Sequence, residues 1–341
     1  MKKTFFPTRL LPLAAIAISL LLSAASPDRD ASPGAGASAS PHTLRLLYWN
    51  IQNAMWSGQA DGYSEFLEFV KEQNPDICVW AEASTNYRTA SAERITDDSE
   101  RYFPAAWEEF ARRYGHLYTY KGGHRDNFPQ VITSRYPIEN VERIVGNADT
   151  VVSHGAGWAT LTKDGHKINI VTLHTWPQRY AWNIVDKEAR KADAEAKGGD
   201  RYRRKEMEYI CRHTINSVPG ADRELWMMMG DFNAMSRLDN RFYGFPADTS
   251  AFLCHDVVLE RTPYIDVIQK KYPDSLVSTI HSRRRIDYVY CTPPLYNCIT
   301  RAEVIRDSYT TPRRDPQKLS NFWHPSDHCP ILIDFDLDIL K

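Results

Sequence analysis

The sequence lacks an excess of charge of either sign, because 42 Lys and Arg residues stand against 43 Asp and Glu residues in a chain of 341. No global basic surplus therefore indicates a nucleic-acid partner, although a neutral protein can still carry a local basic groove. With 43% hydrophobic and 25% charged residues, the composition is that of a globular protein. It excludes a wholly disordered chain, a collagen and a coiled coil.

After residue 25 the sequence also lacks any apolar run close to the ~18 residues that span a bilayer. Before that point, three basic residues precede an uncharged run over residues 10–22, and small residues follow at 23–25. This order is typical of a cleaved signal peptide rather than of a membrane anchor. We therefore predict a secreted or periplasmic protein, with a signal peptide at 1–25 and no stable membrane insertion after its removal.

Residues 26–42 consist mainly of Ser, Ala, Pro and Gly. Such a segment has too few apolar side chains to offset the entropy lost on ordering, which predicts a flexible linker. The remaining residues, 43–338, show no internal repeat. We expect them to fold as one monomeric domain with an insertion around residues 176–200.

Cysteine is also scarce, with six residues and none at the spacing of a zinc knuckle. An exported chain could pair its cysteines. Cys291 and Cys298 flank a short Pro-Pro loop, so we expect this pair to form a disulfide. Cys78 and Cys211 lie in apolar strand and helix patterns and are expected to be small core residues.

Apolar spacing predicts strands and helices along the whole of the expected domain. Spacings of three and four residues predict helices at 63–70, 107–114 and 207–218. Strands are predicted at 44–51, 77–81, 116–121, 130–133, 158–163, 167–174, 225–230, 286–291, 302–305 and 331–335. Many strands with a few helices indicate sheets that pack together with helices outside.

Six of the predicted strand ends carry a carboxylate, an amide or an imidazole. These residues are Asn50, Glu82, His174, Asp231 with Asn233, Asp287, and Asp327 with His328. Each of them alone is more often a turn residue than a ligand. Layered sheets bring strand ends together on one rim, however, so the repetition predicts a single functional site there.

Seven short motifs occur in an order that resembles the endonuclease/exonuclease/phosphatase superfamily, which includes DNase I. They lie at residues 49–52 (WNIQ), 75–82, 134–137 (SRYP), 172–174 (TLH), 230–233 (GDFN), 286–288 (IDY) and 326–328 (SDH). The motifs spread over nearly all of residues 43–338, and GDFN with a late SDH is a specific combination. The resemblance implies an α+β fold, a four-layer αββα sandwich of two mixed sheets packed face to face. It also implies metal-dependent cleavage of phosphoester bonds.

The resemblance further implies how the site would hold a metal ion and a water molecule. Asn50, Glu82 and Asp327 would bind a divalent cation, and oxygen ligands without thiolates suit Mg²⁺ or Mn²⁺ better than zinc. His328 would activate or position the attacking water. Asp287 would hydrogen-bond the other ring nitrogen and fix the tautomer.

Three further catalytic residues follow from the same resemblance. Asp231 and Asn233 would contact the nucleophile and the phosphate, and the general base stays open between Asp231 and His328. His174 would contact the phosphate or act as the acid for the leaving group. Members similar to DNase I, sphingomyelinases and phosphatases carry a histidine at this position, whereas abasic-site endonucleases do not.

Three segments depart from the family pattern and supply candidate substrate-binding residues. The polar loop with Arg125 and Asn127 either reaches a phosphate or is simply solvated. Trp176 opens the insertion with aromatic residues directly after a catalytic strand, so we expect it to help select the substrate. Arg285 ends a run of three arginines next to Asp287 and is a candidate phosphate ligand.

Two classes of function remain for this sequence. The first is an exported, metal-dependent phosphoesterase that acts on a nucleic acid, a lipid head group or a small phosphoester. The second is a catalytically silent DNase I-like binding module, which would have lost metal or histidine positions, and none is missing here. Within the enzyme class, a nuclease stays open beside a lipid or small-molecule phosphodiesterase or phosphatase, because neither a strongly basic surface nor an apolar lipid-inserting hairpin is evident.

Overall fold

The computed structural model describes residues 42–87, 95, 97, 107–122, 129–145, 151–314 and 320–341. All of them lie in one compact unit, Ser40–Lys341. The predicted signal peptide, all but the last residue of the predicted linker, and the candidates Arg125 and Asn127 lie outside the described residues. Within the described ranges, none of the helices combines the length and the apolar character that a bilayer span requires.

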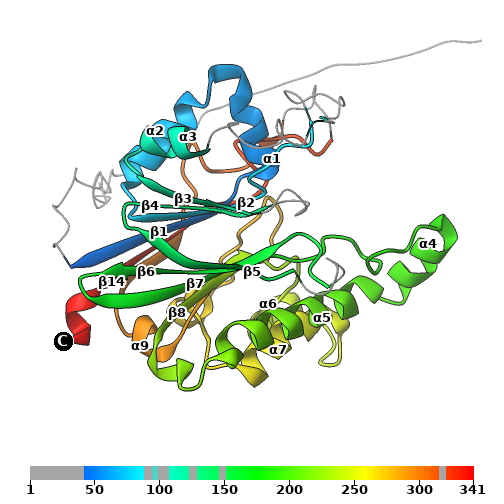
Figure 1. Ribbon diagram of the computed structural model, residues 1–341. Helices are drawn as coiled ribbons and strands as arrows, with labels where there is room; N and C mark the ends of the chain where they lie inside the picture. The colour runs from blue at the N-terminus through cyan, green and yellow to red at the C-terminus, as the bar shows by residue number, and fades with distance from the viewer. Residues whose placement is uncertain are drawn as a thin grey trace, which may run out of the picture. The chain divides into compact units, whose positions relative to one another are not determined.

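Two six-stranded mixed sheets lie at the centre of this unit (Figure 1). In spatial order, the first consists of β11 (Ile299–Val304), β14 (Ile331–Asp336), β1 (Thr43–Asn50), β2 (Ile77–Ala81), β4 (Val131–Ser134) and β3 (Tyr118–Lys121). The second consists of β5 (Ile138–Arg143), β6 (Ala156–Lys163), β7 (His166–His174), β8 (Leu225–Asp231), β10 (Asp287–Cys291) and β9 (Ile265–Asp266). A separate pair joins β12 (Arg313–Arg314) to β13 (Trp323–His324).

The side chains of each central strand divide between two apolar layers. In β1, Leu46 and Tyr48 belong to the cluster that also contains the inner residues of the second sheet. Leu47 and Trp49 belong instead to a cluster on the outer face of the first sheet. Successive side chains of a strand point to opposite faces, so a strand that is buried on both faces needs this continuous apolar run.

Helices cover the outer face of each sheet (Figure 1). On the first sheet, α2 (Ser64–Gln73) and α3 (Trp107–Arg112) contribute most of the outer aromatic side chains. On the second, α5 (Gly198–His213) and α7 (Leu253–Arg261) pack their apolar stripes. The remaining helices are α1 (Gln52–Met55), α4 (Lys187–Glu195), α6 (Asn240–Tyr243), α8 (Val267–Lys271) and α9 (Pro293–Tyr296). The predicted α+β fold, a four-layer αββα sandwich, is therefore confirmed.

Two local features differ from the sequence-based expectation. Strand β5 was not predicted, because five of its six residues are exposed at a sheet edge and show no apolar alternation. Helix α5 begins at Gly198, well before residue 207, where the sequence predicts this helix to start. A Cβ on Gly199 would lie 2.2 Å from the carbonyl oxygen of Gln178, so glycine is needed there for a close backbone contact.

The predicted Cys291–Cys298 disulfide is wrong, because all six cysteines are free and buried. Both residues lie in the cluster between the sheets. The short helix α9 separates them, and within this turn the Cys298 thiol donates to the Pro294 carbonyl at 3.4 Å. Burial raises the pKa of both thiols, which keeps them in the protonated form. Cys78 and Cys211 are core residues, as predicted.

Candidate active site

Strand direction brings the predicted site residues to one edge. In the parallel pair β1 and β2, Asn50 lies beside Ala81, the residue before Glu82. In the parallel pair β7 and β8, His174 lies beside Asp231. Strand β10 is antiparallel to β8, so its first residue, Asp287, lies opposite Asp231. The motif at 326–328 precedes β14, which is antiparallel to β1 and therefore begins at the same edge.

Asn50 joins the two sheets at this edge. Its Nδ2 donates to Glu82 Oε1 at 3.3 Å and to Asp231 Oδ2 at 3.1 Å. Its Oδ1 accepts the backbone N–H of Gln52 at 3.1 Å. The fully buried amide thus links two carboxylates from different sheets and fixes its own orientation through the backbone.

The segment after Asn50 holds Glu82 by an unusual backbone conformation. The four residues of α1 all have φ between 38° and 57°, which makes this a left-handed turn built without glycine. Each L-residue in such a turn costs roughly 1–2 kcal/mol, and such strain clusters at functional sites. The turn aims the N–H of Asn53 at Glu82 Oε2 (3.0 Å) and the N–H of Ala54 at the Glu82 carbonyl (2.7 Å). This turn was not predicted from the sequence, because the segment has no run of glycine or asparagine, the residues that favour positive φ.

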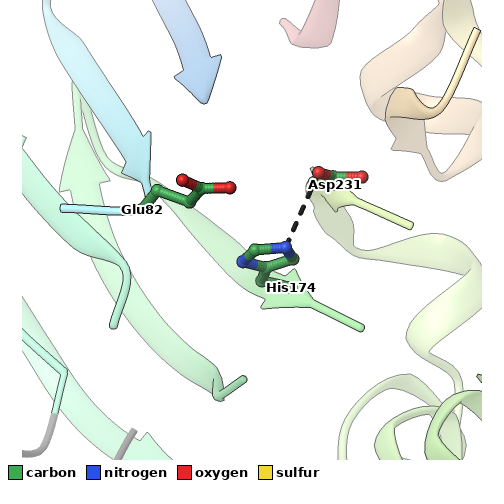
Figure 2. Close-up of side chains that lie close together, drawn as sticks. All are labelled: Glu82, His174 and Asp231. Atoms are coloured by element: carbon green, nitrogen blue, oxygen red, sulfur yellow. Dashed lines mark ion pairs between the residues drawn. The ribbon is translucent and has the colours of Figure 1, made fainter. Parts of the chain in front are cut away.

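Glu82, His174 and Asp231 face one another across the site (Figure 2). His174 Nε2 lies 3.6 Å from Asp231 Oδ2, and both side chains are almost fully buried. Burial, together with His154 and His328 nearby, holds the pKa of His174 well below its ordinary value. Its imidazole is therefore neutral at physiological pH.

His328 and Asp287 form a buried pair next to Asp231. The Nδ1 atom of His328 lies 2.7 Å from Asp287 Oδ2, and the hydroxyl of Tyr48 donates to Asp287 Oδ1 at 2.8 Å. The Nε2 atom of His328 lies 3.8 Å from Asp231 Oδ2 and 3.8 Å from Asp327 Oδ1. Burial opposes the charged form of His328, but the adjacent Asp287 and Asp327 hold its pKa well above the ordinary value.

The two acids at the centre carry more negative charge than their neighbours neutralise. Burial and then Asp287 raise the pKa of Asp231 well above its ordinary value. Burial and then Asp327 raise the pKa of Glu82 to about 7. Among the described residues no Lys or Arg is paired with either carboxylate. Like charges held this close favour either protonation or a bound cation.

The donor set could hold a divalent cation. Glu82, His174 and Asp231 offer ligand atoms within 4.8 Å of one another, and so do Asp231, Asp287 and His328. Asn53 Oδ1 is buried and accepts no hydrogen bond among the described residues, which leaves one more oxygen next to Glu82. Hard carboxylate and amide oxygens are what such ions prefer. Of the predicted ligands, Glu82 belongs to one of these groups. Asn50 contacts both Glu82 and Asp231 through its amide, and Asp327 lies 3.8 Å from His328 Nε2.

The remaining predicted residues take different places. Asn233 lies at the site, where its N–H donates to Asp231 Oδ1 at 2.8 Å and its Nδ2 donates to the Thr175 carbonyl at 3.1 Å. Trp176 follows the strand of His174, as expected, but it is only 8% exposed.

Arg285 is not placed to bind substrate. Its guanidinium is 1% exposed and donates to Asp239 Oδ2 at 2.9 and 2.6 Å and to both oxygens of Asp266 at 2.7 and 2.8 Å. It also lies over the ring of Tyr288, 4.3 Å from the centroid. Asp287 is the first residue of β10, and its carboxylate contacts His328. Arg285, two residues earlier, belongs instead to a structural salt bridge.

A buried carboxylate on α5 was also missed. Glu206 is fully buried and accepts the N–H and Oγ–H of Ser153 at 2.8 and 2.6 Å and the N–H of Trp176 at 2.8 Å. Burial raises its pKa to about 7. It joins the loop before β6 to the segment after His174. The apolar spacing that predicts the helix at 207–218 gives no signal for Glu206, since only the tertiary fold places this acid inside.

Comparison with solved structures identifies the fold. The chain is similar to an AP endonuclease from Archaeoglobus fulgidus (TM-score 0.56, 16% identity, 86% of this chain and 99% of that chain). It is similar to the 3′ phosphatase NExo from Neisseria bound to product DNA hairpin (TM-score 0.56, 14% identity, 86% and 99%). It is similar to an endonuclease/exonuclease/phosphatase family protein from Bacteroides thetaiotaomicron (TM-score 0.50, 16% identity, 86% and 98%).

No protein-family model and no curated protein matches the sequence. The architecture nevertheless defines a class: two mixed sheets with helices outside and an acidic, histidine-containing edge. This is the fold of the similar solved structures, one of which is named as an endonuclease/exonuclease/phosphatase family protein, so the fold that the sequence resemblance implied is confirmed.

Proposed function

We propose that this protein is a divalent-metal-dependent phosphoesterase that hydrolyses its substrate by direct attack of water. The observation that carries the proposal is the meeting of Glu82 and Asp231 with the buried His328–Asp287 pair at one sheet edge. The solved neighbours named as an AP endonuclease and a 3′ phosphatase support phosphoester hydrolysis for a chain with this fold.

Glu82 and Asp231 would hold Mg²⁺ or Mn²⁺, with Asn50 and Asp327 completing the surrounding polar set. When bound, such an ion neutralises the negative charge that develops on a phosphoryl oxygen. The raised pKa values of both carboxylates mark the cost of keeping them charged without an ion. Asn50 holds the two carboxylates at a fixed separation through its Nδ2.

The proton of the attacking water passes to the Asp231–His328 pair. The water oxygen forms a bond to phosphorus while the bond from phosphorus to the departing alkoxide oxygen breaks. The alkoxide takes up a proton from solvent, and the pair afterwards returns the proton it accepted to solvent, so that the step balances. Asp287 keeps the Nδ1 side of His328 occupied, so that Nε2 faces Asp231. A carboxylate behind a catalytic imidazole fixes the tautomer and stabilises its charged form.

His174 acts on the phosphate rather than as the acid. Its pKa lies well below the ordinary value, so the ring is neutral and suited to hydrogen-bond a phosphoryl oxygen. Asn233 is the second phosphate contact, fixed by its bonds to Asp231 and Thr175. Both residues hold the phosphate in a fixed orientation. Such pre-organisation lowers the activation barrier.

A substrate panel in the presence of Mg²⁺ tests this proposal. The panel contains duplex DNA, RNA, sphingomyelin, inositol phosphates and bis-p-nitrophenyl phosphate. We expect hydrolysis of at least one member, loss of activity in EDTA and recovery with Mg²⁺ or Mn²⁺. The variant Glu82→Gln should be inactive, whereas Tyr118→Ala should be active, because Tyr118 lies on β3 at the opposite end of the first sheet. Full turnover in chelator would contradict the metal assignment, and no turnover on any member would favour a silent binding module.

We also propose that the chain is exported, on the basic and apolar pattern of residues 1–25. Mass spectrometry of the exported protein should find a terminus near residue 25. An exported protein that retains Met1 would contradict the proposed cleavage.

A further inference from the structure

Aromatic side chains of the insertion form a layer behind His174. The ring centroids of His154 and His174 lie 4.9 Å apart, and His154 lies 5.5 Å from Trp176 and 6.5 Å from Trp182. The two tryptophans meet edge to face at 4.6 Å and 87°. The layer therefore runs from a catalytic residue outward into the segment that departs from the family pattern.

Within this layer Trp176 is the anchor. It is 8% exposed, its N–H donates to Glu206 at 2.8 Å, and its indole Nε1 donates to the carbonyl of Tyr180. The buried Arg203 donates to the Trp176 carbonyl at 2.7 Å. Every polar group of Trp176 is thus used inside the protein, so this ring supports the layer and offers no face to a ligand.

Trp182 differs from Trp176, because it is partly exposed. Its indole N–H makes no hydrogen bond among the described residues, and the aromatic rings nearest to it there are those of Trp176 and His154. The chain around it is held firmly: the N–H of Ala181 donates to Asp193 Oδ2 at 2.5 Å, and Gly199 donates to the carbonyl of Arg179 at 2.8 Å. The ring is therefore positioned before any substrate arrives.

Helix α4 supports the segment around Trp182. None of its residues is buried, and it extends away from the two sheets (Figure 1). Asp193, on this helix, is the residue that holds Ala181. Because α4 buries none of its side chains, packing against a core does not account for it. Its hydrogen bond to Ala181 indicates instead that it holds the Trp182 segment in place.

We propose that Trp182 is the surface on which a nucleobase of the substrate stacks while the attached phosphate lies at His174. This inference rests on the proposed phosphoester hydrolysis and names its substrate class, a nucleotide or an end of a nucleic acid. A single flat ring face suits a planar base, and every base has such a face. An inositol ring has none.

A quaternary ammonium head group fits the same ring less well. Such cations are bound by several rings that surround them. Here Trp176 is buried, and the ring of Tyr180 already carries the guanidinium of Arg190 at 5.1 Å from its centroid. This leaves Trp182 as the one partly exposed ring of the layer, which suits a stacked base better than a choline group that needs several rings around it.

The test compares two trinucleotides that differ in one base. One carries thymine next to the cleaved phosphate, and the other has an abasic residue there. The quantity measured is the ratio of the two kcat/KM values, with circular dichroism to confirm folding. Stacking on one aromatic side chain changes affinity enough that Trp182→Ala should lower this ratio about 10-fold. Trp182→Phe, which keeps a ring, should retain most of it, and the remote Tyr118→Ala should match the wild type.

A ratio for Trp182→Ala within about 2-fold of the wild-type ratio overturns the stacking proposal, since the loss expected for one base is larger. A binding experiment separates this inference from the proposed function. Calorimetry with thymidine 5′-monophosphate, deoxyribose 5-phosphate and phosphocholine needs no turnover. If the protein hydrolyses no member of the substrate panel and neither trinucleotide, but binds the nucleotide best and only with Trp182, stacking stands and the proposed hydrolysis fails. Equal binding of the two sugar phosphates, or preferred binding of phosphocholine, overturns stacking whatever the activity.

Discussion

Two buried charged clusters lie close together in this protein and differ in how their charge is balanced. In the first, Arg285 donates four hydrogen bonds to Asp239 and Asp266. In the second, the hydrogen bonds that Glu82 and Asp231 accept from the described part of the chain come from the Asn50 amide and the backbone, with imidazole nitrogens 3.6 and 3.8 Å from Asp231. Arg285 and Asp231 are both at most 2% exposed, whereas Glu82 is half-buried. Exposure therefore does not explain why Asp231, unlike Asp239 and Asp266, has no Lys or Arg partner among the described residues.

The first cluster has the charge balance of a structural ion pair, and the second has that of a functional site. A buried ion pair with good geometry satisfies itself and needs no ligand. A buried acidic cluster without a permanent cation raises the pKa values of its own members, and perturbed values of this kind gather at functional sites. Arg285 and Asp287 are only two residues apart in the sequence, but β10 begins at Asp287. Arg285 therefore lies in the first cluster, whereas Asp287 contacts His328 at the second.

The largest expected effect is on turnover. His328→Ala should lower kcat by ~10²–10⁴-fold, because a positioned acid–base group contributes about that much. Asp287→Asn should also lower kcat, since it removes the charge that stabilises the imidazolium. The double variant should lose little more than His328→Ala alone, because the two act as one unit. Additive losses of a few-fold, with the fold intact by circular dichroism, would remove both residues from the mechanism.

Breaking the first cluster should affect stability instead. Arg285→Ala leaves two buried carboxylates without their cation, and breaking a buried pair in this way costs about 3–5 kcal/mol. Urea unfolding monitored by circular dichroism measures this, and Arg285→Lys should lose less. An Arg285→Ala protein of normal stability with a raised KM would instead restore the original prediction of a phosphate ligand.

The smallest expected effect concerns pH. Glu206 has a pKa of about 7 in the folded protein against an ordinary 4.5, so its charged form is penalised on folding. The wild type therefore loses stability as pH rises from 4.5 to 7, and Glu206→Gln escapes this loss. The Tm of Glu206→Gln minus that of the wild type should rise over this range and stay level above it. A difference that does not change with pH would mean that Glu206 is charged without penalty.

The sequence predicted the fold better than it predicted which charged side chains are buried and what they contact. Apolar periodicity located the central strands, and their polar ends marked Asn50, Glu82 and Asp231, because strand direction alone brings such ends together. It missed the left-handed turn after Asn50, which depends on contacts with Glu82 and the chain near Asn321. It misplaced Arg285, since nothing in three consecutive arginines tells which one is buried.

The central claim is that the second cluster is built for a divalent cation. Isothermal titration of the full chain with Mn²⁺ tests it without any substrate. The account predicts saturable binding that is lost in Glu82→Gln and retained in Tyr118→Ala, with protons released as the raised-pKa carboxylates ionise. Absence of binding by the wild type, or binding that Glu82→Gln leaves unchanged, would contradict it.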